Sequence, residues 1–207
     1  MRTWRRTGAG DDVRICSNLE VYECQLLASM VESITDLLTE RAETAPRDEL
    51  STLTGIVTGH TDAPDDVTLG RLLPDFHRPD QESELTAGPI ASDLNGGLRS
   101  VNEPKIIDAK LEAARTVLET LPAEGGDVAL TEAQADRWLA ALTDIRLALG
   151  AMLGISDHPS NIPPDHPHAA HQDVYDWLSV VQGLLVDALM SAEWTQPEDP
   201  TQEWGAW

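Results

Sequence analysis

The chain has 207 residues, of which 41% are apolar and only 4% aromatic, and its formal net charge is -22. This length fits one domain with a core built mainly from aliphatic side chains, which favours helices. So acidic a surface repels phosphate backbones, and we therefore expect no direct binding of nucleic acid. No apolar run is long enough to span a membrane, and we therefore expect a cytoplasmic protein.

The N-terminal segment is predicted to form a β-hairpin followed by a long helix. Residues 3–7 and 12–16 read as two short strands on either side of the turn-rich sequence GAGDD. A helix follows over about 18–43, and Ser17 with Glu20 has the spacing of a capping box at its start. Apolar residues at helical spacing predict the buried face of this helix: Leu19, Tyr22, Leu26, Met30, Ile34 and Leu37.

The next part of the chain, residues 46–102, has weaker periodicity. Short helices are expected within 48–56 and 65–76, the second capped by Asp65 or Asp66. The sequence TAGPIASDLNGGLRS at 86–100 contains one proline and three glycines, which predicts an irregular surface connection.

Regular structure returns in the second half of the chain. Helices are predicted from Asn102 to about Leu121 and, after a capping box of Thr131 and Gln134, to about Leu153. Between them, residues 127–130 read as one short strand that would pair with the N-terminal hairpin.

A last helix is expected over 172–191. It is apolar on most sides, which predicts a place at the centre of the core. The fold class is therefore mainly α: a helical bundle with a small antiparallel sheet, formed by one domain over 1–191. Residues 192–207 form an acidic tail that contains tryptophan.

Three segments resemble one known family when taken in order along the chain. They are LLPD at 72–75, LTDIRLALGAMLGI at 142–155 and VYDWL at 174–178. The pattern is similar to an actinobacterial family catalogued as a domain of unknown function (number two thousand and seventeen). The resemblance implies a helical protein with a small sheet, no established enzyme activity and a link to transcriptional control of oxidative-stress responses. A redox role in the family depends on an N-terminal cysteine pair, and the only pair in this chain is Cys16 and Cys24.

The two cysteines are the candidate redox element. With Cys16 at a strand end and Cys24 inside the helix, the rise along the helix separates them by more than the ~7 Å that a disulfide allows. Oxidation to a disulfide would therefore unwind the first helical turn, and Arg14 with the helix N-terminus would increase the thiolate fraction of Cys16. The alternative is that both are buried, inert thiols.

A histidine-rich loop over 158–171 is a candidate metal site. Its candidate ligands are His166, His168, His171 and Asp165. Their spacing matches no strong metal motif, and the prolines of the loop favour a solvated connector instead. A small metal-dependent enzyme that uses this loop remains the runner-up function.

Two further sets of residues are notable. Asp144 and Arg146 lie among apolar residues, and Arg146 with Asp176 predicts a structural ion pair between two helices. The tail carries three tryptophans that would anchor a contact with a partner or with the domain itself: Trp194, Trp204 and Trp207. The third alternative is a disordered tail.

The functional prediction combines these observations. The sequence offers no phosphate-binding loop and no nucleophile motif. We expect a non-enzymatic regulator without a cofactor that acts through protein contacts, with a basic protein or part of the transcription machinery as its partner. The alternatives are a plain adaptor protein and DNA binding through the arginines of residues 1–7.

Overall fold

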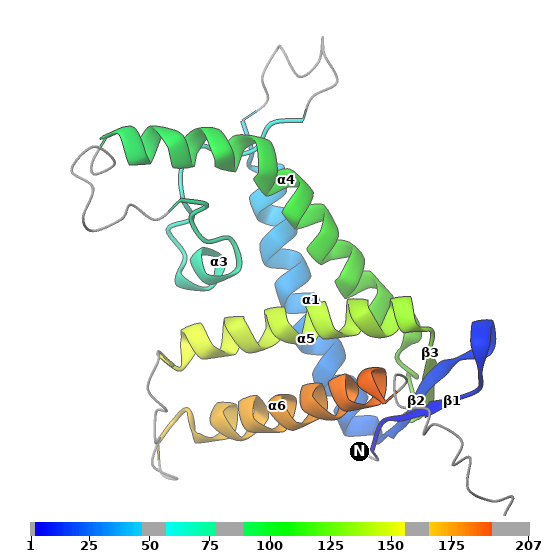
Figure 1. Ribbon diagram of the computed structural model, residues 1–207. Coiled ribbons are helices and arrows are strands. Elements are labelled where there is room, and N and C mark those ends of the chain that lie inside the picture. Colours follow the sequence, from blue (N-terminus) through cyan, green and yellow to red (C-terminus); the bar gives the residue numbers. More distant parts are fainter. Residues whose placement is uncertain (1–2, 47–56, 78–88, 156–165, 192–207) are drawn as a thin grey trace, which may run out of the picture.

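The computed structural model describes residues 3–46, 57–77, 89–155 and 166–191. Within these residues the chain forms five α-helices and one three-stranded antiparallel sheet, which confirms the predicted mainly α fold class. Helix α5 crosses α1, α6 runs beside α5, and the sheet lies at one end of the helices (Figure 1). No helix in the described part of the chain is long and apolar enough to cross a membrane.

The sheet has the strand order β1-β2-β3, with β1 at Arg5–Thr7, β2 at Arg14–Leu19 and β3 at Gly126–Leu130. The predicted hairpin and its pairing with the later strand are both confirmed. Burial alternates along β2, so that Ile15, Ser17 and Leu19 face the core. The sheet therefore has one covered face and one outer face.

The hairpin is held to the core by a tryptophan at its start. Trp4 is 3% exposed and packs edge-to-face on Trp138, with 5.6 Å between the ring centroids. Trp138 is fully buried on α5 and donates from its indole Nε1 to Thr120 Oγ1 at 2.8 Å. The N-terminal arm is thus part of the domain rather than an appendage.

Helix α1, Val21–Glu43, begins later than predicted. Ser17 does not cap it, because β2 continues to Leu19 and pairs Ser17 with Val128 of β3. The capping box is formed one turn further on by Glu20 and Glu23. A strand partner from more than a hundred residues away therefore decides where this helix starts.

The buried face of α1 also differs from the predicted one. Tyr22 is 65% exposed, and Leu26 and Leu37 are only partly buried. The sequence contains a second apolar stripe with equally good helical spacing, and the core covers that one. Its members are Cys24, Leu27, Val31, Ile34 and Leu38.

Helix α4 spans Pro89–Thr120, so the prediction of an irregular segment over 86–100 is wrong from Pro89 onward. The helix bends part-way along its length (Figure 1), as expected for a helix with an internal proline, here Pro104. Proline has no N–H, so the carbonyl of Ser100, four residues earlier, lacks its helical donor. Gly59 N donates to that carbonyl at 2.7 Å and replaces the missing bond.

Glycine at position 59 fits the close approach of this segment to Pro104. A Cβ there would lie 3.0 Å from both Cδ and Cγ of Pro104. Helix α3, Val67–Leu72, follows this segment and is capped by the side chain of Asp66, as predicted.

Helix α5, Glu132–Met152, is the central helix, because it contacts α1, α3, α4 and α6. The predicted capping box of Thr131 and Gln134 is present at its start. Helix α6, Ala169–Met190, packs on α5 and the hairpin through one face only.

The prediction that this last helix is central is therefore wrong. Val180 is 58% exposed and Met190 is 68% exposed, because α6 covers α5 from outside. The predicted short helix within 48–56 and the tail over 192–207 lie outside the described residues.

Candidate functional site

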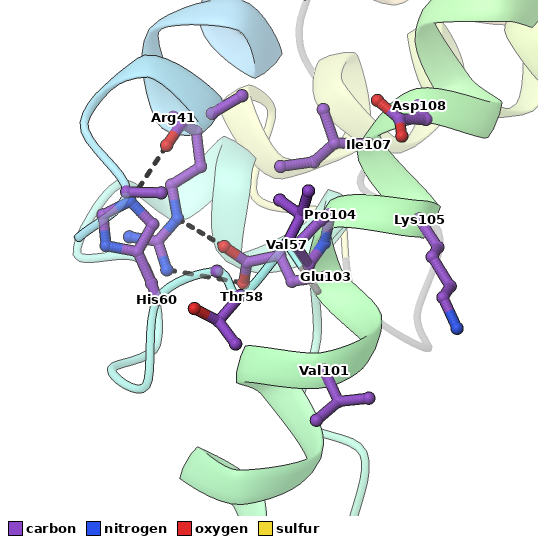
Figure 2. Close-up of a pocket in the computed structure, with 13 residues that line it drawn as sticks. Arg41, Val57, Thr58, His60, Val101, Glu103, Pro104, Lys105, Ile107 and Asp108 are labelled. Atoms are coloured by element: carbon purple, nitrogen blue, oxygen red, sulfur yellow. Dashed lines mark hydrogen bonds and ion pairs between the residues drawn. The ribbon is translucent and has the colours of Figure 1, made fainter. Parts of the chain in front are cut away.

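A hollow lies where α4 bends beside the end of α1. Its volume is about 580 Å³. Figure 2 shows Arg41 of α1 and Glu103 of α4 directed toward each other across this pocket, and Lys105 directed away from them. The wall is mainly small and apolar, formed by these residues: Ala42, Ala45, Val57, Val101, Pro104 and Ile107.

A buried carboxylate between two arginines forms one side of the pocket. Glu103 is 1% exposed and accepts from Arg41 Nε and from Arg99 Nη1, both at 2.8 Å. Arg99 is also 1% exposed and donates to Asp75 at 2.8 Å and to the carbonyl of Leu73 at 3.0 Å. The charges in this cluster satisfy one another, as buried charges must.

Arg41 connects this cluster to the segment that follows α1. Its Nη2 donates to the carbonyl of Asp62 at 2.6 Å, while its own carbonyl lies 2.9 Å from His60 Nε2. The pocket cluster, defined as Arg41, Arg99 and Glu103, thus joins α1 and α4 to the segments on either side of α3. Its first role is structural.

The exposed apolar residues beside the pocket suggest a contact surface. Val57 is 71% exposed and Val101 is 49% exposed, and both line the pocket. Along α4, Ile90 and Leu94 are 63% and 45% exposed. Positions 90, 94 and 101 fall on one side of a helix, so these residues form an apolar stripe that runs into the pocket.

The cysteines do not lie together on one surface. Cys16 lies on the outer face of β2, where Arg5 is its partner in β1 and Ala129 its partner in β3. Its Sγ lies 3.4 Å from Thr7 Oγ1, in a hollow of about 360 Å³.

Cys24, by contrast, belongs to the hydrophobic core and is 3% exposed. Burial, and to a lesser degree the charge of Glu23, raise the pKa of the Cys24 thiol above its ordinary value. The two thiols are free, one on the outer sheet face and one in the core. Cys16 lies within β2 rather than beside the N-terminus of α1, so the predicted position at a strand end is wrong.

The predicted ion pair between Arg146 and Asp176 does not form. Arg146 donates to Gln182 Oε1 at 2.5 Å and lies 5.2 Å above the Tyr175 ring, whereas Asp176 accepts from Gln172 of its own helix. Asp176 is exposed on α6.

Asp144 pairs instead with Lys110 of α4. This carboxylate is 5% exposed and accepts from Lys110 Nζ at 2.5 Å. Desolvation by burial raises the pKa of Asp144 above its ordinary value, and the contact with Lys110 offsets part of that rise.

The histidine-rich loop is described only from residue 166 onward, and Asp165 lies outside the described residues. The rings of His166 and His168 lie 5.3 Å apart, and those of His168 and His171 lie 5.7 Å apart. No group of three or more metal-binding side chains converges in the described parts of the chain. Trp194, Trp204 and Trp207 also lie outside those parts.

The pocket cluster is absent from the sequence-based predictions. Its one local signal is the spacing of Arg99 and Glu103, which places opposite charges at i and i+4 of a helix. That signal becomes readable only if residues 89–102 are helical, and the glycines of this segment argue against a helix. The contribution of Arg41 from α1 has no local signal at all.

The described architecture is that of a mainly helical protein with a small antiparallel sheet, a neutralised internal charge cluster and an exposed apolar stripe. The chain belongs to the family described as Domain of unknown function (DUF2017), whose model matches residues 1–189. This confirms the resemblance drawn from the sequence.

Curated relatives carry a functional name. The chain is 46% identical over 195 residues to proteins named oxidative stress regulator AosR in Mycobacterium bovis and Mycobacterium tuberculosis. In each case the match covers 93% of this chain and 89% of the relative. No solved structure matches the chain.

Proposed function

We propose that this protein is a cytoplasmic, non-enzymatic regulator of the oxidative-stress response that acts by binding another protein. The name of its mycobacterial relatives supports the regulatory role. The observation that carries the proposed mechanism is the apolar stripe of Ile90, Leu94 and Val101 that leads into the pocket.

The stripe suits a protein partner for two physical reasons. Exposed apolar residues that continue into a hollow are typical of protein contact sites. The buried charges beside them are already paired within the pocket cluster, so a partner gains apolar burial there without having to neutralise a buried charge. The net charge of -22 further favours a partner with a basic surface.

The proposal includes a partner in the transcription machinery, which can be tested with purified components. The measurement is the affinity of the chain for purified actinobacterial RNA polymerase holoenzyme, by biolayer interferometry at fixed salt. A charge placed in the stripe, L94E/V101E, is expected to weaken binding by about 30-fold, the effect of losing one well-buried anchor.

The matched control is V180E/M190E, which places the same two charges at exposed positions of α6. Its affinity should equal that of the wild-type chain. Equal affinities for all three proteins would reject the stripe as the contact surface. Failure of the wild-type chain to bind would reject the transcription machinery as partner.

The redox part of the proposal begins at Cys16, whose side chain is accessible from the outer face of the sheet. Peroxide would oxidise the Cys16 thiol to a sulfenic acid and be reduced to water. Attack by the Cys24 thiol would then form the disulfide and release a second water molecule. Because Cys24 belongs to the first turn of α1 and its side chain is buried in the core, this second step requires that turn to open.

Thiol trapping with mass spectrometry, before and after mild peroxide, tests this step together with far-UV circular dichroism. A disulfide between Cys16 and Cys24 with a reversible fall in helicity is the expected result. If both thiols stay reduced, the redox part is wrong, and the role in protein binding is tested separately by the stripe variants.

A further inference from the structure

A second groove lies between the N-terminal arm and the end of α6. Its volume is about 540 Å³. The arm contributes Thr3, Trp4, Arg5, Arg6 and Gly8, and α6 with its cap contributes these residues: Leu184, Asp187, Ala188 and Ser191. We call it the tail groove, because the chain leaves the described domain at Ser191, inside it.

The tail groove offers one arginine that is unpaired within the described residues, in a strongly acidic protein whose net charge is -22. Arg5 and Arg6 line it with one carboxylate, Asp187. Arg6 is paired with Glu132 at 2.7 Å. Arg5 is exposed and has no ion-pair partner among the described residues, so its charge is available to a ligand.

The floor of the groove is apolar. Trp4, which is 3% exposed, forms part of it. Leu184 and Ala188 supply apolar surface beside it.

The segment that directly follows Ser191 has the complementary chemistry. Residues 192–207 carry four carboxylates, no basic side chain and three tryptophans. A tether that begins inside the groove gives these side chains an effective concentration of the order of millimolar. The family match ends at residue 189, so this tail lies outside the region shared with the family.

We propose that the acidic tail, residues 192–207, docks in the tail groove of its own domain, with a tail carboxylate on Arg5 and a tail tryptophan on the apolar floor. Arg5 and Arg6 also line the adjacent hollow that contains Cys16, and Arg5 is the strand partner of Cys16. The docked tail therefore covers one approach to the Cys16 thiol. This contact is independent of the stripe on α4 and of the proposed partner.

The test uses the full-length chain with R5K, which places an amine at the proposed contact. A zero-length carbodiimide joins a carboxylate to an amine only where the two groups touch, and mass spectrometry of the monomer locates the link. We expect the tail peptide linked to position 5, with a yield that falls about fivefold in 1 M salt because exposed ion pairs are screened.

The matched control is R115K, which places the same amine on α4, where the Arg115 side chain is 64% exposed. The native amine of exposed Lys105 serves as a second control in every sample. Tail links at position 5 that are no more frequent than at positions 105 and 115 would overturn the proposal. Links found only between two chains would overturn it too, since the occupant would then be the tail of a second copy.

The alkylation rate of Cys16 gives an independent measurement that does not depend on cross-linking. A variant with all four tail carboxylates replaced by amides should react about fivefold faster than the wild-type chain, because the tail no longer binds Arg5. E112Q removes one surface carboxylate elsewhere and should react at the wild-type rate. Equal rates in all three proteins would contradict a docked tail over this hollow.

Discussion

Removing the charge of Glu103 should destabilise the domain more than any surface charge change, and the structure gives the reason. In Glu103→Gln the pocket cluster keeps Arg99, 1% exposed, and Arg41, but loses the carboxylate that accepts from both at 2.8 Å. A buried charge left without its partner costs about 3–5 kcal/mol of unfolding free energy. For a chain of this size that corresponds to a fall of about 10 °C in Tm.

The assay is urea unfolding followed by far-UV circular dichroism. The slope of unfolding free energy against urea concentration should be the same in all variants, so that a shifted midpoint reports a change in stability. Arg99→Met should cost less than Glu103→Gln, because Glu103 keeps Arg41 and the Asp75 side chain is 52% exposed and can be hydrated. Glu112→Gln is the surface control. The Glu112 side chain is 43% exposed and pairs with Arg137, so its loss should change the unfolding free energy by about 0.5 kcal/mol or less. A Glu103→Gln value as small as that of the control would refute the assignment of a desolvated cluster.

Three further predictions concern backbone contacts, pH and thiol reactivity. Gly59→Ala should lower the unfolding free energy by about 1–3 kcal/mol, because its Cβ would meet the Pro104 ring at 3.0 Å. Gly97→Ala is the control and should raise the unfolding free energy by up to about 1 kcal/mol, because a Cβ there has open space around it. Equal effects of the two substitutions would contradict the close contact at Gly59. Burial raises the pKa of Asp144 in the folded state, so its contribution to stability is full below its ordinary value of 3.8 and is lost as pH rises through the folded pKa. When urea unfolding is measured from pH 3.8 upward, the unfolding free energy of Asp144→Asn should therefore rise relative to that of the wild-type chain. A difference between the two that does not change with pH would show that the carboxyl is not desolvated. Iodoacetamide should modify Cys16 in the native protein and reach Cys24 only in urea, since Cys24 is 3% exposed; labelling of both native thiols would contradict the burial of Cys24.

The elements that the sequence predicts well are those fixed by local chemistry. The capping box of Thr131 and Gln134 and the cap at Asp66 satisfy backbone donors within the same turn, so neighbouring residues suffice to find them. The strand at 126–130 is likewise bounded by Gly125 and Gly126, both with positive φ, on one side and by the helix cap on the other.

The elements that the sequence predicts poorly depend on contacts from far along the chain. Residues 89–100 read as irregular because of Gly96 and Gly97, yet Gly96 lies against the backbone of Thr61, where a Cβ would be 3.4 Å from its carbonyl oxygen. Gly96 therefore lies in a helix that packs against a distant segment rather than in a turn. The start of α1 and the partner of Arg146 were missed for the same reason, since β3 decides the first and Gln182 of α6 the second.

The hydrogen bond from Gly59 to Ser100 has a mechanical consequence for α4. The half of α4 before Pro104 carries the stripe, and the bend joins this half to the one that packs on α1 and α5. Straightening the helix would break the Gly59–Ser100 bond without restoring another, because Pro104 has no proton to donate, at a cost of about 1 kcal/mol. This hydrogen bond therefore ties the half of α4 that carries the stripe to the segment that contains Gly59, and the same segment supplies Val57 to the pocket wall.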